Sequence, residues 1–252
     1  MNSPPLSFPW TIAFSAVMGL SIFLTLPLTF KRNPGQTGLR LLVSVATGIL
    51  VFLIADVFSD VSNMLYDGSL YGYGSSPPRD AAFAFSLIAG FAVVFLVENS
   101  SKTGLTPSAA SYTVALGIGF QNLTEGLLFG SLGSTIGLSG YALVVLFGFV
   151  LQNITEGFPI AVPLIGKRDT GTTMFSALLL GGAPTILGGA VGYYYSTPTL
   201  SLVFDGLAVG AMIYVVLPMM KSLFRNLDYS SQRLVYAAIL LGFLVGFAVN
   251  LF

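Results

Sequence analysis

The chain has 252 residues, of which 54% are hydrophobic and only 8% are charged, and its ten basic residues balance its ten acidic ones. An average soluble domain carries roughly 25% charged residues, so this composition excludes an ordinary soluble domain and a disordered chain. With a mean hydropathy of +0.86, the sequence predicts a polytopic membrane protein whose partner is the lipid bilayer. A net charge of zero gives no basic patch for nucleic acid.

A membrane-spanning helix needs about 20 mostly apolar residues. Eight segments meet this requirement and predict an all-α protein with one transmembrane domain over residues 1–252. Unbroken apolar runs such as LVVLFGFVL favour helices over the alternating strands of a barrel. The predicted helices cover residues 10–30, 41–60, 81–98, 111–131, 140–164, 174–195, 200–220 and 234–252.

Basic residues gather in alternate connections between the predicted helices. Nine of the ten follow the first, third, fifth or seventh helix, and only Arg79 lies in the other set. Positive charge stays on the cytoplasmic side of a membrane. The pattern therefore predicts a multi-pass protein of the cell membrane with both termini outside the cytoplasm.

Acidic residues lie near the predicted outer ends of two helices. Asp56 and Asp60 end the second helix, and Asp205 begins the seventh. Together they form a candidate outer entrance that would draw cations inward electrostatically. The alternative is that they are solvated helix ends.

A polar motif occurs twice inside apolar segments. The fourth helix contains QNLTEG at residues 121–126 and the fifth contains QNITEG at residues 152–157, so five of six letters repeat at a spacing of 31. Carboxylates within a bilayer cost about 2.5–3.5 kcal/mol each on insertion scales and are usually functional. The candidate metal ligands are Gln121, Asn122, Glu125, Gln152, Asn153 and Glu156.

The short connection between these two helices makes them antiparallel neighbours. Equal depth then places Gln121 opposite Glu156 and Glu125 opposite Gln152, around a pseudo-twofold axis in the membrane plane. Inverted symmetry around a midplane site is typical of secondary transporters. Because the chain has no cysteine and no histidine, any metal site must use oxygen ligands, which suit Mg, Mn or Fe(II). The alternative is an interhelical hydrogen-bond lock with protonated glutamates.

The paired motif resembles that of the ZIP family of divalent-metal transporters. The family pattern is HN-x-x-E-G or HN-x-x-D-G on the fourth helix, and QN-x-x-E-G on the fifth in the prokaryotic branch similar to GufA. QNLTEG differs from the first pattern at Gln121, whereas QNITEG matches the second in full. GAPT on the sixth helix and GAMIYVV on the seventh are also similar to that branch.

This resemblance implies a 3+2+3 bundle in which helices 1–3 and 6–8 are inverted repeats around helices 4 and 5. It also implies import of zinc, iron, manganese or a similar divalent ion into the cytoplasm, with the ion as substrate and no permanent cofactor. The two Gln and two Glu residues would form a primary site, and the two Asn residues would contribute to a second one that shares both glutamates. The sequence leaves open whether the chain forms a homodimer.

The sequence departs from the family where Gln121 replaces histidine and where residues 176–190 contain no acidic residue. A non-transporting relative that acts as a metal sensor or scaffold is therefore the alternative function. An intramembrane enzyme is not expected, since the buried acids lie within amide motifs and no buried lysine is evident.

Overall fold

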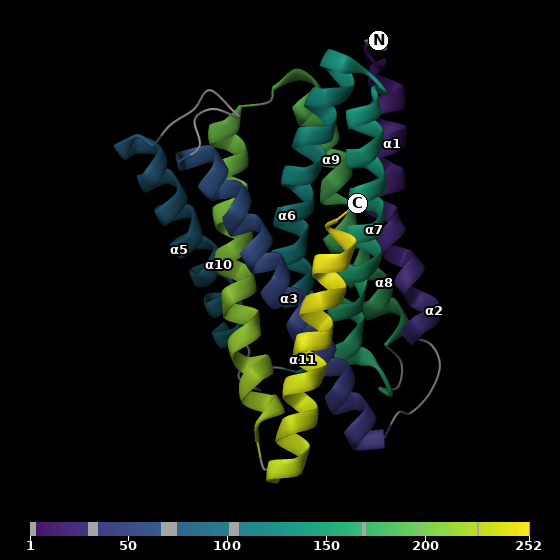
Figure 1. Ribbon diagram of the computed structural model, residues 1–252, viewed down its shortest axis with the longest axis vertical. Helices are drawn as coiled ribbons and strands as arrows, with labels where there is room; N and C mark the ends of the chain where they lie inside the picture. Colours follow the sequence, from purple (N-terminus) through teal and green to yellow (C-terminus); the bar gives the residue numbers. More distant parts are fainter. Residues whose placement is uncertain are drawn as a thin grey trace.

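The computed structural model describes residues 4–29, 35–66, 75–100, 106–167, 170–195, 197–225 and 227–251, and these residues form a helical bundle without a strand (Figure 1). Four basic residues used in the charge pattern, Lys31, Arg32, Lys102 and Arg168, lie outside this part of the chain. The helices are α1 (Phe8–Leu20), α2 (Leu26–Thr29), α3 (Gly35–Tyr66), α5 (Pro77–Ser100), α6 (Pro107–Ile136), α7 (Gly140–Ala161), α8 (Gly171–Gly182), α9 (Pro184–Tyr194), α10 (Pro198–Leu223) and α11 (Tyr229–Val249). Two 3-10 turns, η1 (Ser21–Thr25) and η2 (Val162–Leu164), join α1 to α2 and extend α7.

Every predicted span falls on helical structure within the described residues, but the boundaries and continuity differ. The α3 helix has 32 residues, a length of roughly 48 Å, so it extends well beyond the predicted 41–60. The predicted first span changes to 3-10 geometry at Ser21, and the predicted sixth span breaks at Ala183 into α8 and α9. Pro184 begins α9, and since proline has no backbone N–H it cannot continue the hydrogen bonding of α8.

In the part of the chain that the structure describes, seven helical segments are long and apolar enough to cross a membrane, as in a multi-pass membrane protein, rather than the expected eight. The segment outside this group is α6, which contains the predicted span 111–131. Its 30 residues are long enough, but serine, threonine, glycine and the QNLTEG motif lower its mean hydropathy. The length of α6 therefore agrees with the predicted membrane span, but its mean hydropathy is lower than the prediction implied.

The position of α6 inside the bundle explains its polarity. It packs against α1, α7, α8, α9 and α10, whereas large exposed apolar side chains gather on the surrounding helices. On α6 itself, Tyr112 is the one large hydrophobic residue that is exposed among the described residues. A helix surrounded by protein does not need a lipid-facing apolar surface.

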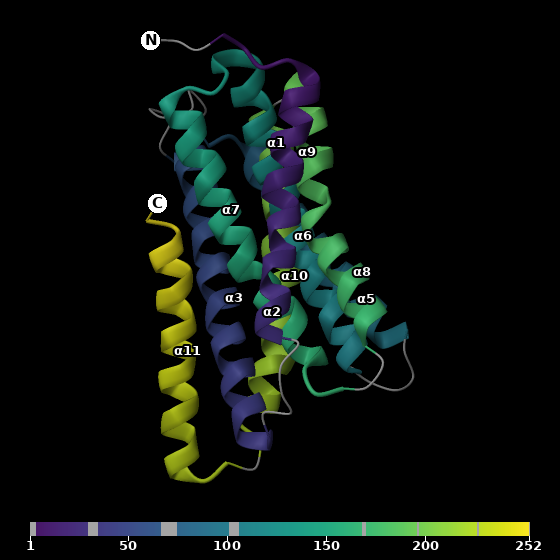
Figure 2. The same cartoon turned by 90° about the vertical axis from the view of Figure 1, so that its right-hand side faces the viewer.

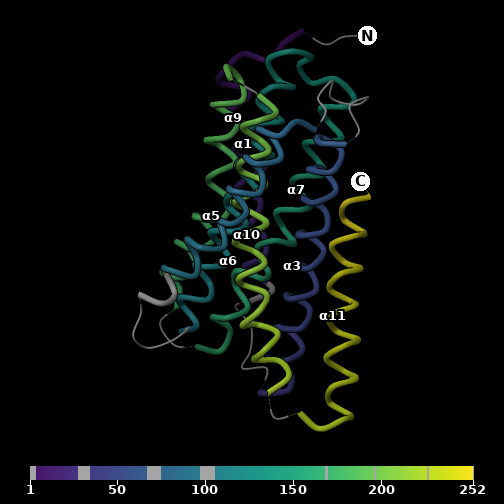
Figure 3. The backbone as a smooth tube through the Cα atoms, turned by 90° about the vertical axis from the view of Figure 1, so that its left-hand side faces the viewer, coloured from purple at the N-terminus to yellow at the C-terminus, as the bar shows by residue number. Residues whose placement is uncertain are grey.

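Long-range packing pairs helices that are distant in sequence. The α3 helix lies along α11, as Figures 2 and 3 show, and α5 lies along α10. The α6 helix packs on α8 and α9, while α7 packs on α1 and η1. The largest buried apolar cluster joins α3, α6, α7, α8 and α10 and includes Leu50, Ile118, Ile160, Leu178 and Met212. In the same views α11 ends well short of the end of the bundle where the N-terminus lies.

Glycine allows α6 and α9 to approach closely. A Cβ atom added to Gly126 would meet the carbonyl oxygen of Thr185 and would lie 2.8 Å from the backbone nitrogen of Gly189. These neighbours are backbone atoms of α9, which cannot move aside as a flexible side chain can. The QNLTEG motif thus ends in a residue whose lack of a side chain allows two helices to pack closely.

We expect Gly126→Ala to lower stability in detergent by about 1–3 kcal/mol, the usual cost of overpacking a filled interior. The measurement is thermal unfolding followed by size-exclusion chromatography. Gly140→Ala is the matched control, because a Cβ at Gly140 meets nothing within 4 Å. Equal melting temperatures for the two variants would contradict the close approach of α6 and α9.

Candidate metal site

The two polar motifs meet where α6 and α7 face each other. All six candidate ligands are buried, and Asn122, Asn153 and Glu156 have no exposed surface at all. Asn122 Nδ2 donates to Asn153 Oδ1 at 2.9 Å, and Asn153 Nδ2 donates to Glu125 Oε2 at 3.4 Å. The structure therefore brings the two motifs into one polar cluster between antiparallel helices, as predicted.

Pairing within this cluster differs in detail from the predicted register. The hydrogen bonds that cross from α6 to α7 involve Asn122, Asn153 and Glu125. Gln121 instead donates to Glu125 of its own helix, with 3.5 Å between Nε2 and Oε1. Residues at i and i+4 lie on one helix face about one turn apart, so this contact follows from the motif spacing.

A cavity of about 330 Å³ reaches the cluster from one side. Gln121, Glu125 and Gln152 line it, whereas Asn122, Asn153 and Glu156 are not among its lining residues. The three predicted entrance acids, Asp56, Asp60 and Asp205, line the same cavity. Three of the six candidate ligands thus line the same cavity as the three candidate entrance residues, and the other three ligands do not line it.

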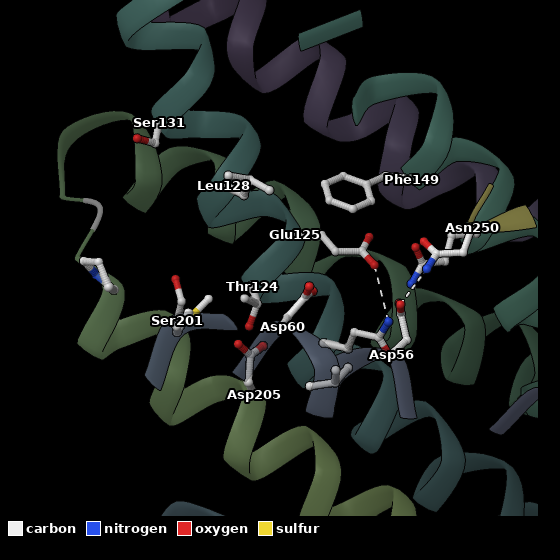
Figure 4. Close-up of a pocket in the computed structure, with 15 residues that line it drawn as sticks. Asp56, Asp60, Thr124, Glu125, Leu128, Ser131, Phe149, Ser201, Asp205 and Asn250 are labelled. Carbon is white, nitrogen blue, oxygen red and sulfur yellow. Dashed lines mark hydrogen bonds between the residues drawn. The ribbon is translucent and has the colours of Figure 1, made fainter. Parts of the chain in front are cut away.

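The acids of the cavity come from three helices. In Figure 4, Glu125 of α6 lies between a group formed by Asp60, Asp205 and Thr124 and a pair formed by Asp56 and Asn250. Only 4% of Asp205 is exposed, so it is not a solvated helix end. No lysine or arginine belongs to the residues that line this cavity. A cavity lined by acids without basic partners concentrates cations.

Asn250 is a lining residue that sequence reasoning missed. Its Nδ2 atom donates to Asp56 Oδ1 at 2.6 Å, which ties the end of α11 to α3 beside the cavity. The feature of the sequence that could have indicated Asn250 is the presence of a polar amide at the end of a strongly apolar helix. Thr124 also lines the cavity, and its position within QNLTEG was not singled out.

Several buried oxygen atoms in the cluster lack a hydrogen-bond partner among the described residues. They are both carboxylate oxygens of Glu156, Oε1 of Gln121 and Oδ1 of Asn122. The amides of Gln152 and Asn122 lie near Glu156, but no hydrogen bond of good geometry joins either of them to its carboxylate. A buried polar group without a partner costs about 1–3 kcal/mol, and more when it is charged. All four atoms are acceptors, so the cluster lacks donors or a cation.

Glu125 and Glu156 are both buried in this cluster. Among the described residues, no group of three or more Asp, Glu, His or Cys side chains is placed to hold a metal ion. A metal site here must therefore combine two carboxylates with amide oxygens. Such a ligand set suits hard divalent cations better than soft ones.

Comparisons with family models and with curated proteins found no relative of this chain.

We expect the cavity to admit water and small reagents. Because the chain has no cysteine, a single introduced thiol is the only one present. Ser131→Cys on the cavity wall should react with a membrane-impermeant maleimide, measured by mass shift of the detergent-solubilised protein. Ile118→Cys on the same helix has no exposed surface and should stay unlabelled on that timescale. Equal labelling of both positions would contradict a cavity confined to one side of the cluster.

Proposed function

We propose that the protein is a transporter of divalent metal cations and that the ion binds between α6 and α7. One observation carries this proposal: two buried glutamates lie in one polar cluster beside an acid-lined cavity, and four buried oxygens of this cluster, two of them on Glu156, have no hydrogen-bond partner among the described residues. A divalent cation would satisfy those oxygens and offset both carboxylate charges. The ion is the substrate, and no permanent cofactor or enzymatic activity is proposed.

A pure hydrogen-bond lock accounts for only part of the cluster. The two asparagines join α6 to α7 through their amides, as a lock would. Glu156 adds no hydrogen bond of good geometry to such a lock, since neither of its oxygens has one among the described residues. A glutamine at that position would serve a lock at lower cost in the membrane. The amides thus support helix pairing, and the glutamates support ion binding.

Packing between helices supports a 3+2+3 bundle with inverted repeats, as in the ZIP family. In this proposal α6 is an eighth span, sheltered from lipid by its neighbours. Exchanging α3 with α10 and α11 with α5 turns the α3–α11 contact into the α10–α5 contact. The same exchange replaces α6 by α7, α9 by α1 and α8 by η1. The contact between α6 and α9 then corresponds to that between α7 and α1, and the contact between α6 and α8 to that between α7 and η1. The contact between α6 and α10 corresponds in the same way to that between α7 and α3.

Orientation follows from the positive charges. We propose that the protein lies in the cell membrane with both termini outside the cytoplasm and that ions pass from outside to inside. Arg40, Lys221, Arg225 and Arg233 would then be cytoplasmic, and the acid-lined cavity would open to the outside.

We expect Glu125→Gln and Glu156→Gln each to abolish most metal uptake into proteoliposomes, measured over a panel containing Mn(II), Fe(II) and Zn(II). Each variant removes one charge and keeps nearly the same shape, so the protein should remain folded. Asp80→Asn is the matched control, because Asp80 lies in the first turn of α5, does not line the cavity and accepts a hydrogen bond from Ser75. Parent-like uptake by both variants and by the double variant would leave the hydrogen-bond lock as the better account. Saturable binding without flux in the parent would favour a sensor or scaffold.

We expect Gln121→His to shift ion preference toward Zn(II), because imidazole suits zinc better than an amide oxygen does. Gln121 lines the cavity and has an unpartnered Oε1, so a nitrogen placed there can reach an ion. The measurement is competition between Zn(II) and Mn(II) for uptake, relative to the parent protein. An unchanged preference would mean that residue 121 does not touch the ion.

A further inference from the structure

The helices α10 and α11 are joined by the short connection 224–228, yet they scarcely pack against each other. Both pack along α3, which lies between them in Figures 2 and 3. This arrangement leaves an open groove of about 360 Å³ between α10 and α11 near their joined ends. Its lining residues are Met220, Phe224, Tyr236, Ile239, Leu240 and Phe243.

The lining of this groove is almost entirely apolar. The hydroxyl of Tyr236 is the one side-chain oxygen among the six lining residues, and none of the six has a side-chain nitrogen. The rings of Phe224 and Tyr236 pack together with their centroids 5.5 Å apart, so they connect the two walls. Tyr236 and Leu240 are both exposed, which means that the groove is open at the surface of the bundle. Such a surface suits a hydrocarbon chain.

Basic residues stand at the joined ends of the same two helices. Residues 206–252 contain Lys221, Arg225 and Arg233 and a single acid, Asp228. Lys221 lies three residues before Phe224 and Arg233 lies three residues before Tyr236. Residues three apart share a helix face, so each of these two cations stands beside a lining residue of the groove. All three cations are exposed.

Local contacts hold one of these charges toward the end of the bundle. Arg233 lies over the ring of Tyr229, 4.6 Å from its centroid, and its Nη2 atom donates to the Tyr229 hydroxyl at 3.2 Å. Tyr229 is one turn closer to the connection, so the guanidinium lies beyond the apolar groove. The nearby acid Asp228 caps α11 by accepting a hydrogen bond from the backbone nitrogen of Ser231.

From this arrangement we propose that an anionic phospholipid binds between α10 and α11, with an acyl chain in the groove and its phosphate group at Lys221 and Arg233. Basic residues that flank a gap between spanning helices bind anionic lipid headgroups through their charge. A zwitterionic phospholipid offers the same chain but no net negative charge. The proposal concerns a different part of the molecule from the acid-lined cavity and is independent of metal transport.

A second copy of the chain fits this groove less well than a lipid does. Two copies related by a twofold axis along the membrane normal would place the same groove of each copy face to face. Lys221, Arg225 and Arg233 would then approach their own counterparts, and like charges that face each other across an interface oppose association. The same three charges attract a phosphate group.

Binding of lipid to the purified full-length protein tests the proposal. Native mass spectrometry in detergent records the first bound lipid during titration with phosphatidylglycerol or with phosphatidylcholine that has identical acyl chains. We expect phosphatidylglycerol to bind at least about tenfold more tightly, because three cations lie at the joined ends. Equal affinity for the two lipids would overturn the proposal. Added salt should weaken only the binding of phosphatidylglycerol, since it screens exposed charges, and this measurement needs no variant.

Charge variants locate the headgroup. Lys221→Gln and Arg233→Gln should each weaken phosphatidylglycerol binding about fivefold, and the double variant roughly 25-fold, with phosphatidylcholine binding unchanged. Lys167→Gln is the matched control, because Lys167 is also exposed but follows η2 and does not line the groove. Parent-like binding by the double variant, or an equal loss in Lys167→Gln, would overturn the proposal.

Two neighbouring leucines locate the acyl chain. Leu240 is 58% exposed and lines the groove, whereas Leu241 is 55% exposed and does not. We expect Leu240→Trp to fill the groove and weaken phosphatidylglycerol binding about tenfold, while Leu241→Trp binds like the parent. Equal effects of the two substitutions would overturn the placement of the chain. A dimer of the parent that Leu240→Trp dissociates would show that a second copy occupies the groove, which would also overturn the proposal.

Discussion

Glu125 and Glu156 must lie away from lipid, and most of the arrangement around them follows from that constraint. A carboxylate facing hydrocarbon is costly, so the helix that carries Glu125 takes a central position in the bundle. Close approach of those neighbours then requires small residues, which explains why Gly126 directly follows Glu125 and contacts the backbone of α9. Protection of the carboxylates and the tight packing of α6 therefore have one cause.

The two glutamates of the cluster differ in their access to the cavity. Glu125 faces an acid-lined cavity, whereas Glu156 has no exposed surface. Glu125 accepts two amide hydrogen bonds, and Glu156 accepts none. A cation that enters the cavity would meet Glu125 first and would then find in Glu156 the oxygens that lack any partner. Glu125 and Glu156, which hold the same position in the two motif copies, thus differ in their access to the cavity.

Sequence predicted the elements and the cluster better than it predicted their details. Apolar length alone located the helices, and the repeated QN-x-T-E-G letters located six residues that meet between α6 and α7. The break at Ala183 was not predicted, although Pro184 was visible, because a proline within an apolar run is compatible with a continuous kinked helix. The role of Asn250 depends on where α11 ends relative to α3, which is a tertiary relation that no local pattern encodes. The expected number of apolar spans was wrong because of α6. A helix needs an apolar surface where it contacts lipid, and α6 contacts mainly other helices.

On the other side of the glutamates the protein is closed by apolar packing. Ile160, Ala161 and Val162 follow Glu156 along α7 and η2, and all three have no exposed surface. Ser111 of α6 donates to the carbonyl oxygen of Ile160 at 2.7 Å, just before Pro163, whose ring nitrogen carries no hydrogen. This bond holds the end of α7 against α6 where proline has weakened the helix. Passage of an ion beyond Glu156 would require this buried segment to separate from α6, at the end of α7, where Pro163 of η2 has no backbone N–H to donate.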